Sequence, residues 1–284
     1  MSKAVKIYRK NLSRYRRLVY SNRRKSPHIS GDTFAQLCDL RIDHEGFRDI
    51  KLIKSARSIF CQSHTLEEFI GDYHKVINAK ILFAGNSDFE FHDLNLKLPR
   101  SVKRIYLQNS FVSDSKRVFT LPIGLENLSL GGSNSLGRFL PIPYSLPNSR
   151  VLLGPFGETH QVRKQIDDMF KNYSKQIDFK YVTGHISKRS YRKLLQSFNF
   201  VACPRGNGVD THRAWESLYY GRYPIVIRDE WALSLAYLKL PLVFLSNWTP
   251  KEVIEINSNS PSSFDPSKIE SLWEPYWIKI LKTI

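Results

Sequence analysis

One stretch of the sequence, residues 198–229, constrains the fold more than any other. It reads FNFVACPRGNGVDTHRAWESLYYGRYPIVIRD and contains two short apolar runs of the kind that form buried strands. A turn cluster follows the first run, because glycine adopts positive φ freely and asparagine tolerates it. Asp210 is well placed to cap a helix over residues 211–220, and Gly221 stands where helices commonly end on glycine. The stretch therefore predicts a strand, a glycine-rich loop, a helix and a second strand.

This order of elements suits an anionic ligand, because a helix N-terminus presents unpaired N–H groups and a partial positive charge. Arg205 at the strand end and Arg213 in the first helical turn could add charge-assisted hydrogen bonds. Glu216 shares a helix face with His212 and Arg213 and could accept hydrogen bonds from a ribose diol. The pattern fits a diphosphate at the loop and sugar hydroxyls one turn further along. A surface ion-pair network around an ordinary strand–helix turn would use the same residues.

A second stretch, GPFGETH at residues 154–160, repeats this logic. It lies between a predicted strand at residues 150–153 and a helix predicted to run to about residue 176, with Thr159 near the cap. Arg163 would lie in the first turns of that helix. Two such loops in one domain could hold the two ends of a nucleotide sugar. The sequence has neither GxxxxGK[ST] nor a spaced GxGxxG with a following acid, which disfavours P-loop enzymes and dinucleotide oxidoreductases.

Three strands predicted in the first half are each followed by polar, turn-prone residues. They span residues 79–84, 102–107 and 118–123, and GNSD, QN and GLEN follow them. Ligands of open α/β sheets bind beyond the carboxyl ends of strands, so the recurrence favours a cleft over three unrelated loops.

A carboxylate at this edge could act as the general base that activates an acceptor hydroxyl. Asp88 is the first candidate and Asp32 the second, followed by His92 and Glu126. A loop-capping role is the alternative for each of them. The acids near Asp88 also resemble pairs that hold a divalent ion, but the general-base interpretation is favoured and no metal site is predicted.

Composition places the chain among globular proteins, with 284 residues, 42% of them hydrophobic and 13% aromatic. It lacks an apolar run of the roughly 18 residues that a membrane span needs, and its N-terminus lacks the apolar core of a signal peptide. Three cysteines without CxxC spacing argue against a disulfide framework. A soluble, cytoplasmic protein is therefore expected.

The formal net charge is +17, and residues 1–25 contribute ten Lys or Arg and no acid. This arm could tether the protein to an anionic membrane surface or another polyanion, or it could be a solvated segment. A basic nucleic-acid-binding protein is the alternative of a different class. It is disfavoured because the aromatic residues lie within apolar runs instead of alternating with Lys and Arg. A sugar-binding module without catalytic activity is a third interpretation.

Residues 131–147 are rich in Gly, Ser and Pro and predict a linker. The chain then divides into a basic arm (1–27), an N-terminal domain (28–140) and a C-terminal domain (141–284). The second half alternates strands and helices, which predicts a parallel, doubly wound sheet. A helix predicted over residues 269–284 is expected to pack across other elements, back onto the first domain.

The run CPRGNGVDTHRAWESLYYGRYPIV at residues 203–226 resembles the signature of exostosin-like glycosyltransferases. It is most similar to a group of compact enzymes of large algal viruses and bacteria that includes a chlorovirus-type xylosyltransferase. The resemblance extends to shorter motifs in the expected order, namely SGD (30–32), GNSD (85–88), LQN (107–109), PIGLEN (122–127) and GPFGETH (154–160). Relatives often carry His where this chain has Gly85, so no role is carried over to that side chain.

The resemblance implies a GT-B fold, in which two Rossmann-like domains face each other across a cleft. The second domain would hold the nucleotide-sugar donor, and the first would supply the acceptor site and the base, Asp88 or Asp32, for an inverting transfer without a metal or other cofactor. UDP-xylose is the favoured donor, with another UDP-sugar or GDP-fucose as alternatives. The acceptor would be a hydroxyl of an oligosaccharide or glycoprotein glycan, viral or cell-surface, in the host cytoplasm if the chain is viral.

The resemblance also distributes the site residues. On the donor side, the diphosphate and ribose would be held by a set comprising Arg205, Gly206, Asn207, Gly208, Asp210, Thr211, His212, Arg213, Glu216, Gly157, Thr159, His160 and Arg163. The acceptor side would comprise His92, Asn109, Glu126 and Asn127.

Overall fold

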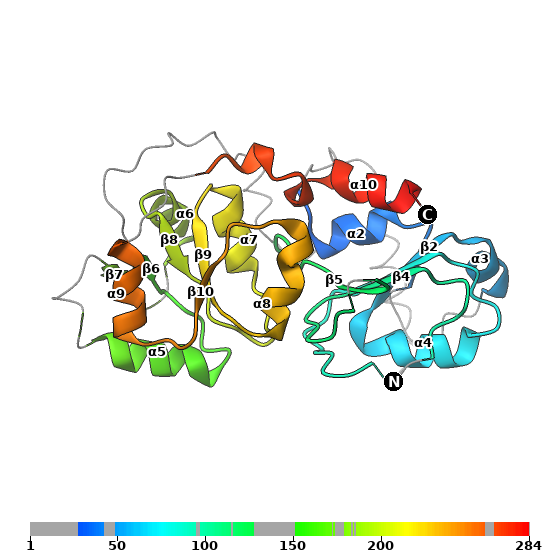
Figure 1. The fold of residues 1–284 in the computed structure, drawn as a ribbon, viewed down its shortest axis with the longest axis horizontal. Helices are drawn as coiled ribbons and strands as arrows, with labels where there is room; N and C mark the ends of the chain where they lie inside the picture. Colours follow the sequence, from blue (N-terminus) through cyan, green and yellow to red (C-terminus); the bar gives the residue numbers. More distant parts are fainter. Residues whose placement is uncertain are drawn as a thin grey trace, which may run out of the picture.

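The structure is a computed structural model that describes residues 28–42, 49–94, 97–114, 116–127, 151–171, 173, 179–182, 184, 186–258 and 264–283. The chain forms two lobes, each built on a five-stranded sheet in which every strand pair is parallel (Figure 1). The expectation of an α/β protein with two parallel sheets is confirmed, and this arrangement is consistent with two Rossmann-like domains. The basic arm (1–27) and the predicted linker (131–147), with the domain boundary inside it, lie outside the described residues.

The first sheet has its strands in chain order, β1–β2–β3–β4–β5. Its strands are β1 (Leu40–Ile42), β2 (Ser58–Gln62), β3 (Ile81–Gly85), β4 (Arg104–Leu107) and β5 (Val118–Thr120). The helices of this lobe are α2 (Gly31–Leu37), α3 (Ile50–Ser55), the 3-10 turn η1 (Ser63–Thr65) and α4 (Leu66–Tyr73). Sequence reasoning missed β1 and α3, which are only three and six residues long.

Side-chain alternation explains how the first sheet is covered on both faces. Leu82 and Ala84 of β3 belong to the buried cluster formed with α3 and α4, whereas Phe83 belongs to the cluster on the opposite face. That opposite face is covered by α2 and by α10 (Glu274–Lys282), which lie side by side (Figure 1). The ring of Trp277 in α10 lies 4.9 Å from Phe34 in α2 and 6.2 Å from Phe83. The C-terminal helix therefore packs on the first lobe.

The second sheet has the order β10–β9–β8–β6–β7. Its strands are β6 (Val151–Leu153), β7 (Phe179–Tyr181), β8 (Phe200–Ala202), β9 (Tyr223–Ile227) and β10 (Val243–Leu245). The chain runs outward from β6 to β7, returns to β8 on the other side of β6, and continues to β10. The strand order therefore reverses between β6 and β8, which makes this position the topological switch point of the sheet.

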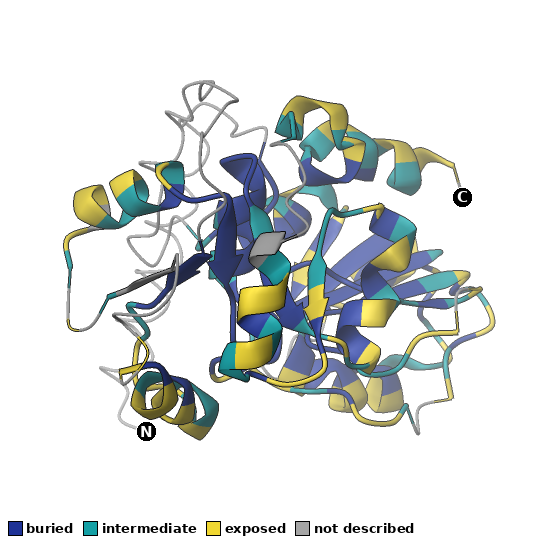
Figure 2. Cartoon of the chain, turned by 60° about the vertical axis from the view of Figure 1, so that its left-hand side comes forward, coloured by how far each residue is buried: buried dark blue, intermediate teal, exposed yellow. Residues whose placement is uncertain are grey.

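The helices of the second lobe cover its sheet from both sides. They are α5 (Gln161–Lys171), α6 (Lys188–Gln196), α7 (His212–Tyr219), α8 (Glu230–Ser234), η4 (Leu235–Leu238) and α9 (Pro250–Ser258). Residues of α5 and α9 share one buried cluster, and residues of α6, α7 and α8 belong to another. Figure 2 shows the central strands buried and the exposed residues on the outer sides of helices.

The cluster beneath α7 continues into the first lobe without a break. It includes Phe83 and Tyr106 of the first sheet and Trp215 and Leu218 of α7. At the junction, the backbone N–H of Ile29 donates to the hydroxyl of Tyr219 at 2.9 Å, and that hydroxyl donates to the carbonyl of Leu272. The two lobes therefore share one core.

The C-terminal segment is less regular than the predicted single helix. It comprises two 3-10 turns, η5 (Pro266–Lys268) and η6 (Glu270–Leu272), before α10. Trp273 between η6 and α10 is extended and forms an antiparallel bridge with His28, so the helical path is interrupted there. Among the described residues, the helices are all too short or too polar to cross a bilayer.

We predict that replacing Gly221 with alanine destabilises the protein by about 1–3 kcal/mol. Gly221 ends α7 with a φ of +68°, and a Cβ there would lie 2.6 Å from the carbonyl oxygen of Phe264. The matched control is Gly71→Ala in α4, where a Cβ would meet nothing within 4 Å. That change should stabilise by about 0.5–1 kcal/mol because alanine has the higher helix propensity. Urea unfolding of both variants checks the pair, and equal effects would contradict the structure.

Candidate functional site

The two glycine-rich loops meet at the switch point of the second sheet. One follows β6 at residues 154–157 and the other follows β8 at residues 203–208. They are in contact, because a Cβ on Gly206 would lie 3.2 Å from the hydroxyl of Thr159 and 2.9 Å from the guanidinium of Arg163. Ligands of doubly wound sheets bind at this position. The loops that sequence analysis singled out therefore form one continuous surface.

Arg163 of α5 ties these loops together. Its Nε donates to the carbonyl of Arg205 at 2.9 Å, and its two terminal nitrogens donate to the carbonyls of Pro204 and Gly157, both at 3.3 Å. Burial lowers the pKa of Arg163, and the nearby Arg213 lowers it further. The structure thus uses this guanidinium to fix the loop backbone, and its expected contact with a diphosphate stays a prediction.

Arg213 of α7 holds the first loop in a similar way. Its terminal nitrogens donate to the carbonyls of Pro155 at 2.9 Å and Gly154 at 2.6 Å. Its guanidinium carbon lies 5.0 Å from the ring centroid of Phe156 and 5.3 Å from that of Tyr191. The buried Nε has no hydrogen-bond partner among the residues that the structure describes. Arg213 is therefore rigidly placed beneath the loop, with one donor unused there.

The start of α7 differs from the prediction at one residue. Thr211, not Asp210, occupies the N-cap position, and its side chain makes no capping hydrogen bond in the described structure. The carboxylate of Asp210 instead accepts from the backbone N–H of Ile123 and from Nε1 of Trp215, both at 2.8 Å. Asp210 is buried, with 3% of its surface exposed, so the prediction that it caps the helix was wrong. It joins the loop to the first lobe.

Asn109 makes the reciprocal contact from the first lobe. It follows β4 with a φ of +54°, and its side-chain oxygen accepts from the backbone N–H of Asp210 at 3.0 Å. Its amide nitrogen donates to the carbonyl of Ser87 at 3.2 Å. A Cβ on Gly208 would lie 2.6 Å from this amide, so glycine is needed for the two lobes to approach this closely. Asn109 was expected on the acceptor side, but its side chain is used between the lobes.

Asn127 and Asp32 form a second polar cluster at the same edge. The side-chain oxygen of Asn127 accepts from the backbone N–H of Asp32 at 2.8 Å, and its nitrogen donates to Asn86 at 2.8 Å. The carboxylate of Asp32 lies 3.6 Å from the guanidinium of Arg41, and 5% of its side chain is exposed. This carboxylate lies in the first turn of α2, is buried beside Arg41 and is poorly presented to an acceptor.

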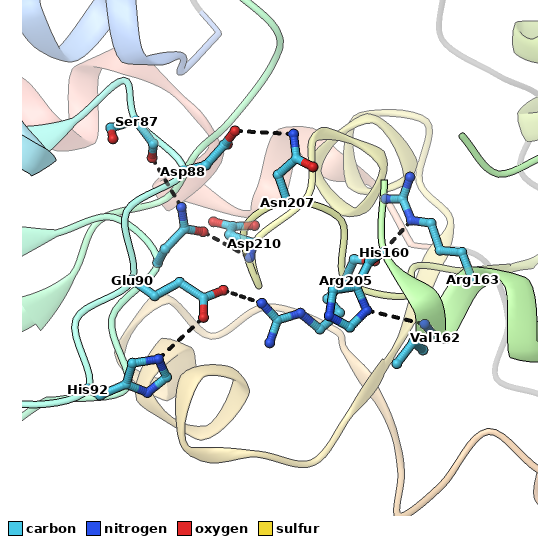
Figure 3. A network of polar contacts seen from close by, with 11 residues as sticks. Ser87, Asp88, Glu90, His92, His160, Val162, Arg163, Arg205, Asn207 and Asp210 are labelled. Carbon is cyan, nitrogen blue, oxygen red and sulfur yellow. Dashed lines mark hydrogen bonds and ion pairs between the residues drawn. The ribbon is translucent and has the colours of Figure 1, made fainter. Parts of the chain in front are cut away.

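Asp88 is placed differently from Asp32. It is exposed, and Nδ2 of Asn207 in the second lobe donates to its carboxylate at 3.3 Å (Figure 3). The structure therefore brings the first-choice base into contact with the glycine-rich loop, whereas the second choice lies buried within its own lobe.

A short ion pair between the lobes joins Glu90 to Arg205. A terminal nitrogen of Arg205 donates to the carboxylate of Glu90 at 2.5 Å, and His92 lies 3.4 Å from the other carboxylate oxygen (Figure 3). His92 also stacks on Phe111, with ring centroids 4.7 Å apart. Sequence reasoning noted Glu90 only within an acidic pair and gave it no role. Its position two residues after Asp88, in the polar segment that follows β3, could have indicated that the two acids lie at the same site.

The remaining predicted residues have partners of their own in the two lobes. Nδ1 of His212 donates to the carbonyl of Gly124 at 2.8 Å, and burial lowers the pKa of His212, so the ring is neutral with its proton on Nδ1. His160 lies beside Arg205, and its ring accepts a hydrogen bond from the backbone N–H of Val162. Burial, and then the charge of Arg205, lower the pKa of His160.

Glu216 is half-buried on α7, and its side chain forms a hydrogen bond with the hydroxyl of Tyr191. Gly157 and Thr159 are exposed in the first loop, and Glu126 is half-buried near His212.

The site therefore consists of two backbone loops at a helix N-terminus, one arginine facing the other lobe, and two carboxylates on that lobe. Within the described residues, no group of three or more His, Cys, Asp or Glu side chains could hold a metal ion. Comparison of the sequence with models of known protein families and with curated proteins found no match.

We predict a pH dependence of stability from Asp210. Burial raises the pKa of its carboxyl to about 7, against the hydrogen bonds from Ile123, Trp215 and Thr211 that favour the charged form. From about pH 4 to pH 7 the folded state then holds a proton that the unfolded chain has released, so the free energy of unfolding falls as pH rises. Asp210→Asn should flatten this slope in urea unfolding. The exposed Asp168→Asn should not, and an unchanged slope in the first variant would contradict the assignment.

Proposed function

We propose that this protein is a glycosyltransferase of the GT-B type that moves a sugar from a nucleotide-sugar donor to a hydroxyl of a glycan acceptor. The observation that carries the proposal is the meeting of both glycine-rich loops at the switch point of the second sheet, directly opposite the carboxylates of the first lobe. Two Rossmann-like lobes with parallel sheets, and a C-terminal helix that returns to the first lobe, also support it. The resemblance of residues 203–226 to exostosin-like enzymes points the same way.

The diphosphate of the donor fits the start of α7. No side chain caps the first turn of this helix in the described structure, which leaves backbone N–H groups for an anion. Arg205 belongs to the loop that leads into α7, and its terminal nitrogen is paired with the carboxylate of Glu90 at 2.5 Å. A diphosphate would compete with this carboxylate for the same guanidinium. Arg163 and Arg213 contribute by holding the loop backbone in place.

The proposed reaction is a single displacement at the anomeric carbon. Asp88 accepts the proton of the acceptor hydroxyl as the hydroxyl oxygen forms its bond to that carbon. The bond from the anomeric carbon to the diphosphate oxygen breaks, and its electron pair leaves with the nucleoside diphosphate. Arg205 and the N–H groups of α7 stabilise the charge that develops there. This stereochemical course is inverting, and the chain's own residues supply each of these roles.

The donor sugar and the acceptor are assigned by resemblance alone. UDP-xylose is the first donor to test, followed by other UDP-sugars and GDP-fucose, and the acceptor class is an oligosaccharide or glycoprotein glycan.

We predict that Arg205→Ala weakens the binding of UDP on the order of tenfold to a hundredfold, because a charge-assisted hydrogen bond contributes about 1.5–3 kcal/mol. The matched control is Lys171→Ala, which removes an exposed cation from the last turn of α5. Isothermal titration calorimetry of both variants with UDP and UDP-xylose provides the measurement. Equal affinities for the two variants would remove Arg205 from the donor site.

We predict opposite consequences for the two carboxylates that face the loop. Asp88→Asn should lower the rate of transfer by about 10²–10⁴-fold and leave UDP affinity within about twofold, because a general base acts on the acceptor. Glu90→Gln should raise UDP affinity, because the negative charge that competes with the diphosphate for Arg205 is gone. Parallel loss of UDP affinity and turnover in Asp88→Asn would assign Asp88 to donor binding instead of catalysis.

A further inference from the structure

A pocket of about 500 Å³ opens beside the loop that follows β8, and residues of both buried clusters of the second lobe line it. It lies beyond the carboxyl ends of β8 and β9, between α5 and the segment that leads from β10 into α9. Its volume lies within the range of small-molecule sites. Arg205 forms part of its wall and reaches Glu90 of the first lobe with its terminal nitrogen. The pocket therefore adjoins the proposed reaction centre, although none of the functions assigned above uses it.

Two buried donors in the wall of this pocket lack acceptors. Trp231 is 3% exposed, and its Nε1 has no hydrogen-bond partner among the described residues. The same holds for Nε of Arg205. Buried N–H groups without partners are rare, because each costs about 1–3 kcal/mol. A ligand with neutral oxygen acceptors in the pocket would satisfy both.

The rest of the wall combines apolar surface with a few further polar groups. Trp248 and Val162 contribute apolar area, and Met169 is a large apolar side chain with 37% of its surface exposed. Asp229 caps α8 by accepting from the backbone N–H of Ala232 at 2.8 Å. Its carboxylate has lone pairs left for a hydroxyl donor. This wall offers apolar and aromatic surface to the C–H face of a sugar ring, and separate donors and acceptors to its hydroxyl groups.

We propose that this pocket binds a pyranose ring, with hydroxyl oxygens accepting from Trp231 and Arg205 and the C–H face resting on the apolar wall. The source of the sugar, either the donor or the acceptor glycan, rests on the proposed function, whereas the chemistry of the pocket does not. A nucleobase fits this place less well. Glu216, the expected ribose ligand, lies on α7 and does not line the pocket.

Trp231→Phe tests the proposal, because it removes the N–H group and keeps an aromatic ring. Its affinity for UDP-xylose or for xylobiose should fall about fivefold to tenfold in titration calorimetry, with UDP affinity unchanged within about twofold. The free energy of unfolding should fall only by the cost of the smaller ring, because the lost donor had no partner. The matched control is Trp277→Phe, whose Nε1 donates to the carbonyl of Ser271 at 3.0 Å. That change should lower stability and leave the ratio of UDP-xylose to UDP affinity unaltered.

A second pair of variants tests the pocket independently, in case Trp231→Phe changes the sugar affinity too little to measure. Met169→Trp fills the pocket and should abolish sugar-dependent affinity while sparing UDP. Ile254→Trp, at a residue of α9 that is 41% exposed and outside the pocket, should have no effect on either ligand.

The outcomes separate this inference from the proposed function. Weakening of UDP-xylose but not of UDP assigns the pocket to the donor's sugar, and weakening of xylobiose alone assigns it to the acceptor. Binding of xylobiose that depends on Trp231, without any nucleotide binding, supports the pocket and contradicts the proposed function. Binding of UDP-xylose that both pocket variants leave unchanged supports the function and overturns the pocket. If neither UDP nor any of UDP-xylose, UDP-glucose, GDP-fucose, xylobiose and lactose binds, both are overturned.

Discussion

The position of the candidate site depends on a buried carboxylate, that of Asp210. Its side chain accepts from the backbone of Ile123 in the first lobe and from the indole of Trp215 in α7, while its own N–H donates to Asn109. These contacts fix the loop after β8 against the carboxyl edge of the first sheet. Because burial raises the pKa of Asp210 to about 7, the arrangement holds a carboxyl group that titrates close to neutral pH. The shared apolar core behind it, from Phe83 to Trp215, keeps the lobes in register.

The arginines of the site divide into two kinds. Arg163 and Arg213 donate to the carbonyls of both glycine-rich loops, which would otherwise lack partners in an irregular backbone. Arg205 instead projects toward the first lobe and meets Glu90. A guanidinium that holds backbone carbonyls is a fixed support, whereas one paired with a carboxylate can exchange that partner for another anion. This difference in partners, more than the number of arginines, identifies Arg205 as the residue able to meet a ligand.

Local rules predicted much of the second lobe because its elements carry clear signals. The apolar runs of β8 and β9, and Gly221 with its positive φ, follow from residue type alone. The role of Asp210 could not be predicted, because an acid that caps a helix and an acid that reaches another lobe look alike in sequence.

Asp32 and Asp88 are also indistinguishable in sequence. Tertiary structure buries Asp32 beside Arg41 and leaves Asp88 exposed beside Asn207. Glu90 was missed for the same reason, since its partner lies 115 residues further along the chain. Short elements such as β1 carry too few residues for a periodic pattern.

Arg205 connects the three parts of the functional argument. Its backbone carbonyl accepts from Arg163, its terminal nitrogen donates to Glu90, and the residue lines the pocket that contains Trp231. One residue of the loop that leads into α7 thus meets a carboxylate of the first lobe and borders the pocket. A transferase must bring an anionic leaving group, a base and a sugar ring within a few ångströms of one another. The guanidinium of Arg205 lies where surfaces suited to these three groups meet, as such a reaction requires. The loop backbone, held by Arg163, keeps Arg205 in this position.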